Sequence, residues 1–420
     1  MGVLAIGVAT VLGAGFILQS SPTTATPSPQ ASSASPSASQ VAQASPSQEA
    51  SPSASASSSP TASPTATPSP TPPVVAGWSK PKLVASSTDC FELVAGIDAS
   101  SGDHLAASCR GKIRYFSSKS DGSWVVTNLP PPAHRLEQTP QIGFQGNTVY
   151  LAYSRVLPDE GCGGGAPDVG VYYRYRRLPD GVWSNPIRLG LVGDRLQSFR
   201  VNGTTLHATV RNDATARVYY ETREATGEYH RYWVKGAIGG TSLRIASDGE
   251  ARIAFEAANS IRFGIFTGAG FDTTKVGGSK PDDWSPNLVL DGNDDPHITW
   301  SRNPHGGCAV REALPDDGTY YATNASGPWT YGRIAKNVGQ SSIQIDGTTG
   351  LVHVVISGNT GLGYYTKTPT AGWRATLLRG EGAEWPLIRL DPATGRLLVA
   401  YFAATPDASA FGGIYVLTKP

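Results

Sequence analysis

The sequence predicts an all-β fold, a β-propeller of about seven four-stranded antiparallel blades that follows a disordered N-terminal stalk. Three observations predict it. Short strands with apolar residues at every second position recur through residues 77–420, an aromatic residue marks each repeat at spacings of 38 to 59 residues, and no helical periodicity interrupts the pattern. Repeats of roughly 40–50 residues that each hold four strands are typical of propeller blades.

The N-terminal part has a different composition from the rest of the chain. Between Met1 and Ser79 there is one charged residue, Glu49, whereas all 34 basic residues and the other 32 acidic residues follow. The apolar run at residues 2–18 predicts a signal peptide or membrane anchor over residues 1–18. Residues 19–76 are mostly Ser, Pro, Ala and Thr, a composition that cannot bury enough apolar surface to fold, so we expect a disordered linker.

Charge and cysteine content limit the classes of partner. The net charge is +1 and no long basic run occurs, which disfavours nucleic acid and anionic membrane surfaces as partners. The four cysteines have no zinc-ligand spacing and favour disulfides in an oxidising compartment. We therefore expect an extracytoplasmic monomer, secreted or held at the cell surface, that meets the membrane only through its N-terminal segment.

An aromatic residue is expected to open the fourth strand of each blade, after a turn that contains glycine. The chain ends on GGIYVLTKP, a third strand with no fourth after it, and the folded part begins with GWSKPKLV, a fourth strand with nothing before it. Pairing of the two ends would complete the seventh blade and remove two exposed strand edges. The markers are Trp78, Trp124, Trp183, Trp233, Phe271, Trp329 and Trp373.

Two of these turns, SKSDGSW (residues 118–124) and RLPDGVW (residues 177–183), resemble the Asp-box, or bacterial neuraminidase, repeat of sialidase-like propellers. The resemblance implies that Asp121 and Asp180 are turn residues on the face opposite the active one. For an enzyme it also implies an arginine triad that holds the substrate carboxylate, a Tyr–Glu nucleophile pair and an Asp acid. The Arg-Ile-Pro motif of that family is absent, so no catalytic residue is assigned.

Two long insertions lie between second and third strands, at residues 156–169 in blade two and 303–318 in blade five. Long loops on one face usually mark the binding side. Each insertion carries a cysteine in a similar setting, and we expect Cys162 and Cys308 to form a disulfide across this loop face. Cys90 and Cys109 flank the first turn of blade one symmetrically, and we expect them to form a second disulfide.

The candidate ligand-binding residues gather at strand ends on the same loop face. Guanidinium groups there could bind a carboxylate or sulfate, and tryptophans at the starts of inner strands suit stacking on a sugar ring. Strand-end arginines and tryptophans with a purely structural role are the alternative. The candidates are Arg110, Arg155, Arg211, Arg302, Glu256, Trp284, Trp385 and His305.

Four histidines, His104, His207, His297 and His353, recur at one position early in the second strand, and this repetition favours a structural hydrogen bond over metal binding. Asp291, Asn293 and Asp295 have the alternating spacing of a calcium loop, but no bidentate glutamate follows. We therefore expect no metal and no cofactor, with calcium as the less favoured alternative.

These observations favour a cell-surface or secreted recognition propeller that binds a glycan or an extracellular protein through its loop face. Two alternatives remain open: a sialidase-like glycoside hydrolase that acts on an anionic sugar, and a purely structural surface propeller.

Overall fold

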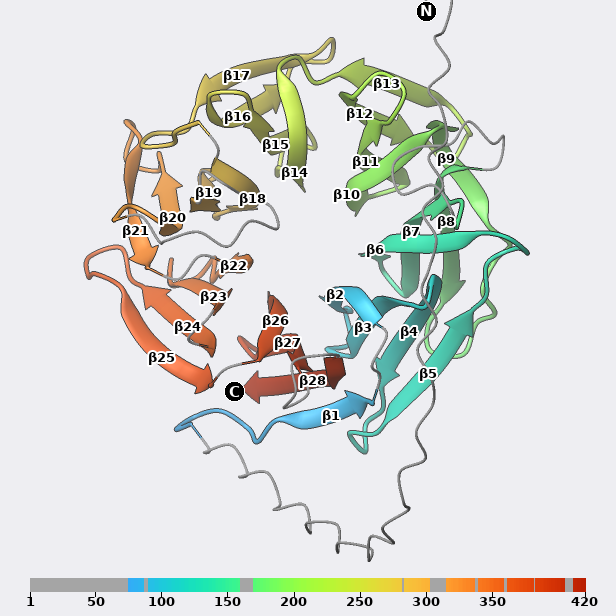
Figure 1. The fold of residues 1–420 in the computed structure, drawn as a ribbon, viewed down its shortest axis with the longest axis horizontal. Coiled ribbons are helices and arrows are strands. Elements are labelled where there is room, and N and C mark those ends of the chain that lie inside the picture. The colour runs from blue at the N-terminus through green and yellow to red at the C-terminus, as the bar shows by residue number, and fades with distance from the viewer. Residues whose placement is uncertain are drawn as a thin grey trace, which may run out of the picture. The chain divides into compact units, whose positions relative to one another are not determined.

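The computed structural model describes residues 75–86, 90–158, 169–281, 283–302, 315–336, 339–358, 361–380, 382–404 and 411–420. The predictions for segment 1–18 and for the linker up to residue 74 lie outside these residues. The described part is an all-β, seven-bladed propeller whose four-stranded antiparallel sheets surround a central axis (Figure 1). Within these residues no helix occurs that could cross a bilayer.

Each of the first six blades is built in chain order from the inner strand to the outer strand. Blade one consists of β2 (Cys90–Ile97), β3 (Asp103–Cys109), β4 (Lys112–Ser118) and β5 (Trp124–Leu129). Blade two consists of β6 (Leu136–Gln145), β7 (Thr148–Val156), β8 (Gly170–Arg177) and β9 (Ile187–Val192). Blade three consists of β10 (Asp194–Asn202), β11 (Thr205–Asn212), β12 (Arg217–Arg223) and β13 (Tyr229–Trp233).

The remaining blades follow the same plan, except that the last one takes its outer strand from the start of the folded part. Blade four consists of β14 (Ala237–Ile245), β15 (Ala251–Ala257), β16 (Ser260–Phe266) and β17 (Phe271–Lys275). Blade five consists of β18 (Asp283–Leu290), β19 (Pro296–Arg302), β20 (Gly318–Thr323) and β21 (Thr330–Ala335). Blade six consists of β22 (Ser341–Ile345), β23 (Val352–Gly358), β24 (Gly361–Lys367) and β25 (Arg374–Arg379). Blade seven consists of β26 (Ala383–Leu390), β27 (Leu397–Ala404), β28 (Phe411–Lys419) and β1 (Lys82–Ala85).

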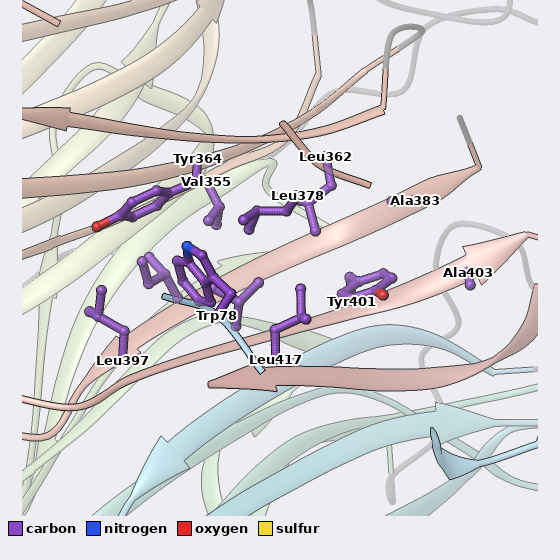
Figure 2. Packing of buried hydrophobic residues seen from close by; sticks show 12 residues of the cluster. Trp78, Val355, Leu362, Tyr364, Leu378, Ala383, Leu397, Tyr401, Ala403 and Leu417 are labelled. Carbon is purple, nitrogen blue, oxygen red and sulfur yellow. The ribbon is translucent and has the colours of Figure 1, made fainter. Parts of the chain in front are cut away.

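The predicted ring closure is confirmed. Strand β1 pairs antiparallel with β28, with Lys82 opposite Val416 and Leu83 opposite Tyr415. Just before β1, the buried side chain of Trp78 enters the cluster between blades six and seven and meets Tyr364 at 5.0 Å between ring centroids (Figure 2). The two ends of the folded chain are therefore held together by a ladder and by a core contact.

The structural role predicted for the repeated histidines is also confirmed. Each histidine hydrogen-bonds the hydroxyl of a tyrosine on the neighbouring third strand, as in the 2.7 Å contacts of His207 with Tyr220 and of His353 with Tyr364. Burial lowers the pKa of both histidines to about 4, so these imidazoles are neutral at physiological pH. The other two pairs are His104–Tyr115 and His297–Tyr321.

The same tyrosines receive the marker aromatics of the following blade, edge to face. Trp183 of blade two meets Tyr115 of blade one at 5.0 Å, and Trp373 of blade six meets Tyr321 of blade five at 5.3 Å. Such T-shaped pairs contribute about 0.5–1.5 kcal/mol beyond burial. The repeat unit is thus a histidine, its tyrosine and the next blade's aromatic residue, which explains why these residues recur together in the sequence.

One predicted marker is wrong. Trp233 ends β13 instead of opening it, and Tyr229 is the aromatic residue at the start of that strand. Trp233, on the outer strand, is 46% exposed, and the guanidinium of Arg217 on β12 lies over its ring. With Tyr229 as the marker, the spacing to Phe271 becomes 42 residues instead of 38, so the repeat in blade four is of ordinary length.

The disulfide predicted between Cys90 and Cys109 is confirmed, because these residues face each other in the β2–β3 ladder. The disulfide predicted between Cys162 and Cys308 involves residues outside the described ranges and stays a prediction.

Candidate functional site

The loop face is formed by the starts of the inner strands and the ends of the second strands. The strand bounds put both long insertions there, since β7 ends at Val156 and β8 begins at Gly170, and β19 ends at Arg302 and β20 begins at Gly318. Residues 159–168 and 303–314 of these insertions, including His305, lie outside the described residues.

Two of the predicted arginines are held in buried ion pairs within their own blades. Arg155 donates from Nη2 to Oε1 of Glu137 at 2.9 Å. Arg302 donates from Nε and Nη2 to the two carboxylate oxygens of Asp283, each at 2.8 Å. Each acid is the ladder partner of its arginine at the start of the inner strand. Both arginines are 5% exposed, so their guanidinium groups face protein and are closed to a solute at the face.

The arginine at the end of the second strand therefore joins this strand to the inner strand through an ion pair, an arrangement called a clamp below. A tyrosine of the third strand completes each clamp, with the guanidinium carbon 4.1 Å from the ring centroid of Tyr172 in blade two and of Tyr320 in blade five. The contact adds a cation–π interaction to the ion pair. The physical reason is register, because the end of the second strand faces the start of the inner strand and not the channel.

The other charged candidates are dispersed. Arg110 is exposed in the tight turn between β3 and β4, where it and Gly111 both have positive φ. Arg211 is half-buried opposite Arg195 in the β10–β11 ladder. Glu256 accepts a hydrogen bond at 2.7 Å from the backbone N–H of Ser285 in the neighbouring blade. These residues and the two clamped arginines do not converge on one point of the loop face.

The two predicted tryptophans do converge. Trp284 near the start of β18 and Trp385 near the start of β26 line one pocket of about 590 Å³. Glu384 stands beside Trp385 and is exposed. Blade six contributes the floor between them, namely Gly339, Gln340, Ser357 and Gly358. The pocket thus bridges blades five and seven across blade six.

Blade six leaves this space because it has no clamp. Gly358 ends β23 as Arg302 ends β19, so the long side chain that fills the equivalent position of blade five is missing. Gly339 lies so close to the chain that a Cβ there would be 1.7 Å from the carbonyl oxygen of Ser357. The floor of the pocket at Gly339 is therefore backbone, and a larger residue there would have to displace β23.

The chemistry of the lining is aromatic and polar. Among the described residues that line the pocket there is no lysine or arginine, and Glu384 is the one charged side chain. The indole N–H of Trp284 is buried and, within the described part of the chain, has no hydrogen-bond partner. Two indoles, an amide, a hydroxyl and a carboxylate form a set that can stack on an apolar ring face and bond to hydroxyl groups.

A second cluster, not anticipated from the sequence, joins a tyrosine and a glutamate. Tyr229 donates to Oε1 of Glu221 at 2.7 Å, and Arg231 bridges Glu221 and Asp194. Glu221 and Asp194 are fully buried, and a Cβ at Gly190 of blade two would lie 2.9 Å from a carboxylate oxygen of each. Burial, and then the charge of Asp194, raise the pKa of Glu221 to about 8. In this structure no solute reaches these two carboxylates.

This cluster could not have been found by motif, because its residues meet through the β12–β13 register, in which Glu221 pairs with Arg231. The available signal was weak: alternate residues of the outer strand, Tyr229 and Arg231, are both polar on the side that faces blade two.

The turn considered for calcium and the first Asp-box turn are both held by hydrogen bonds from backbone N–H groups to an aspartate. Asp291 accepts from the N–H groups of Asn293 and Asp295 at 2.8 and 3.0 Å, which uses one carboxylate oxygen for the turn itself. Asp121 accepts in the same way from Ser123 at 2.7 Å. Among the described residues, no three or more His, Cys, Asp or Glu side chains gather as a metal-binding group.

No protein-family model matches the sequence. No curated protein matches it either. Solved structures do match. A structure of the mitotic checkpoint complex matches with a TM-score of 0.54 and 10% identity, and the match covers 81% of this chain and 93% of the other. The polysaccharide lyase Uly1 gives a TM-score of 0.51 and 12% identity over 80% and 90%. Trypanosoma rangeli sialidase matches with a TM-score of 0.48 and 9% identity, and the match covers 79% of this chain and 55% of the sialidase chain. At these identities the likeness is one of fold, a β-propeller.

Proposed function

We propose that the protein is a recognition propeller that binds carbohydrate in the pocket between Trp284 and Trp385. The observation that carries the proposal is the convergence of these two tryptophans, about 100 residues apart in sequence, on one pocket beside Glu384 and Gln340. Aromatic rings supply apolar contact area at little cost in side-chain entropy, and the polar groups around them provide direction.

The charge of the pocket favours a neutral or amino sugar over an acidic one. Glu384 is exposed at the rim and no cationic side chain is among the described residues of the lining, so a sugar carboxylate would meet a like charge. The volume of about 590 Å³ is in the range of small-molecule sites and would hold a mono- or disaccharide unit of a larger glycan.

The proposed setting is outside the cytoplasm, at the cell surface or secreted. The disulfide between Cys90 and Cys109 supports it, since such bonds persist in oxidising compartments. The Ser/Pro/Ala/Thr composition of residues 19–76 suits a spacer that holds the domain away from a surface. The partner would be a glycan or a glycosylated extracellular protein. One structurally similar propeller belongs to a polysaccharide lyase, so this fold accommodates a protein that acts on a glycan.

A sialidase-like hydrolase is the second candidate, and the contact of Tyr229 with Glu221 favours it. Against it stand the complete burial of Glu221 and Asp194 and the use of Arg231 as a bridge between them. Hydrolysis at this cluster would require the blade two and blade three surfaces to separate.

The test is glycan-array binding by the full chain, followed by calorimetric titration with the sugars that bind. Trp284→Ala should weaken binding at least tenfold, and Glu384→Gln should weaken the binding of an amino sugar more than that of a neutral one. Trp233→Ala is the matched control, because it removes an exposed tryptophan from an outer strand. It should leave the affinity unchanged.

A fluorogenic sialidase substrate, assayed in parallel, addresses the second candidate. Turnover abolished by Glu221→Gln would replace recognition with catalysis as the function. Glycan binding that survives Trp284→Ala at full affinity would show that the pocket is not the binding site.

A further inference from the structure

The inner strands carry one equivalent residue per blade at the level of the repeated histidines. In the ladders, Gly96 pairs with His104, Arg200 with His207 and Gln344 with His353. In each of the other blades, one inner-strand residue pairs with the second-strand residue at the same level. Around the ring these inner-strand residues are Gly96, Gly143, Arg200, Arg244, Val289, Gln344 and Arg389.

The three arginines of this level meet in the central channel. A cavity of about 320 Å³ is lined by Arg200 of blade three, Arg244 of blade four and Arg389 of blade seven. Gln141 and Gln344 add two side-chain amides to the lining, and none of the described residues that line the cavity is an aspartate or glutamate. Gly96 and Gly143 place no side chain at this level, and a Cβ there would lie 2.5 Å from Phe144 and 2.6 Å from Val201, respectively.

The guanidinium groups are bonded to neutral backbone carbonyls. Arg200 donates to the carbonyl oxygen of Phe199 at 2.5 Å, and Arg244 donates to that of Leu243 at 2.9 Å. Arg389 donates to the carbonyl oxygens of Ile388 at 2.7 Å and of Ala95 at 2.8 Å. Within the described ranges, no carboxylate lies within ion-pair distance of any of the three.

Several other arginines of the propeller have a carboxylate as their partner. Arg155, Arg231, Arg302 and Arg396 are each paired with at least one aspartate or glutamate. Charges held in a partly enclosed space without a counter-charge destabilise the folded state. The three channel arginines have no such counter-charge among the described residues, and they share one cavity.

The pKa values of two channel arginines are lowered, because burial disfavours their charged forms. Burial lowers the pKa of Arg389 to about 10, and burial together with the charge of Arg389 lowers the pKa of Arg200 to about 9. Both groups remain charged at physiological pH. A bound anion would relieve the repulsion between them and use the guanidinium N–H groups that the carbonyls leave free.

We propose that the central channel binds one small multivalent oxyanion, a phosphate or a sulfate, free or as the terminal group of a small molecule. Three guanidinium groups and two amides supply donors from several sides, which suits a tetrahedral anion. A volume of about 320 Å³ corresponds to about ten water molecules and leaves space for an organic substituent.

This site is separate from the carbohydrate pocket. Arg389 lies near the end of β26, whereas Glu384 and Trp385 lie near its start on the loop face. The arginines are also distinct from the four predicted from the sequence, which lie on second strands or in the turn after one.

The experiment is calorimetric titration of the full chain at neutral pH with potassium phosphate, sodium sulfate and glucose 6-phosphate, at an ionic strength held constant with chloride. Wild-type protein should bind one anion per chain and saturate. Arg200→Gln and Arg389→Gln should each raise the dissociation constant at least tenfold, whereas Arg374→Gln, on an exposed outer-strand position, should leave it unchanged. Tighter binding of glucose 6-phosphate than of phosphate would identify the anion as part of a larger ligand.

Thermal unfolding supplies an independent readout. In chloride, Arg200→Gln should unfold no earlier than wild type, because it removes an uncompensated charge. In phosphate, wild type should gain stability and the variant should not. If phosphate acts only as an excluded salt, it should raise the unfolding temperatures of wild type and of Arg200→Gln equally. That result, or the absence of saturable binding of all three probes, would overturn the proposal.

Discussion

Replacing Trp78 by alanine tests whether the N-terminal strand closes the ring. Trp78 is 6% exposed and packs among Tyr364, Leu397 and Leu417 (Figure 2). A tryptophan buries roughly 200 Å², which at about 25 cal/mol per Å² corresponds to about 5 kcal/mol, an upper value because a denatured chain is partly compact. Measured Trp→Ala changes in cores span about 3–5 kcal/mol. We expect the free energy of unfolding to fall by about 4 kcal/mol.

The corresponding change in melting temperature follows from the size of the domain. With an unfolding entropy of about 2.1 cal/mol/K per residue and roughly 340 folded residues, a loss of about 4 kcal/mol lowers Tm by about 5–6 °C. Differential scanning calorimetry of the full chain measures this shift. Trp233→Ala is the control, because that side chain is 46% exposed, and it should shift Tm by less than about 2 °C.

Amide hydrogen exchange locates the effect. Loss of Trp78 should accelerate exchange in β28, whose ladder with β1 depends on the anchor, more than in β11 of blade three. Equal shifts in Tm for Trp78→Ala and Trp233→Ala, together with unchanged exchange in β28, would refute the reasoning that the buried indole holds the two ends of the chain together.

Three further outcomes are expected. The folded-state pKa values of His207 and His353 are about 4, below the ordinary value of 6.5, so stability should decline as the pH falls from about 6.5 to about 4, by up to roughly 3 kcal/mol per histidine. Denaturant unfolding across this range measures the decline, which His353→Gln should reduce; an identical slope in the variant would contradict it. The pKa of Glu221 is raised to about 8 from 4.5, so its contribution is fully present below pH 4.5 and is lost as the pH rises through 8. Glu221→Gln should flatten the decline in stability between about pH 4.5 and pH 8, and an unchanged profile would exclude this glutamate as the cause. Asp283→Ala should lower the free energy of unfolding by about 3–5 kcal/mol, because it leaves the guanidinium of Arg302 buried and unpaired; a loss below about 1 kcal/mol in urea unfolding would mean that the clamp is not structural.

Local features of this protein could be read from the sequence because their partners are close in the chain. Cys90 and Cys109 are 19 residues apart in one hairpin, and the histidine and tyrosine of a blade lie on adjacent strands. The period-2 strands and glycine turns likewise specify the blade, and the unfinished blades at the two ends specify closure. The marker of blade three was misassigned, because Tyr229 and Trp233 are both aromatic and the sequence does not show which one begins the strand.

The sites depended on distances that no local pattern encodes. Which arginine has a counter-charge is decided by ladder register, which turned Arg155 and Arg302 toward acids of their own blades. Which arginines lack one is decided by the ring, which brings Arg200 and Arg389, 189 residues apart, into one channel. The sequence by itself determined the repeat, since hydrophobic period and turn chemistry act between neighbours. The tertiary structure alone decided which side chains meet, since closing a ring of sheets converts equivalent positions of distant strands into contacts.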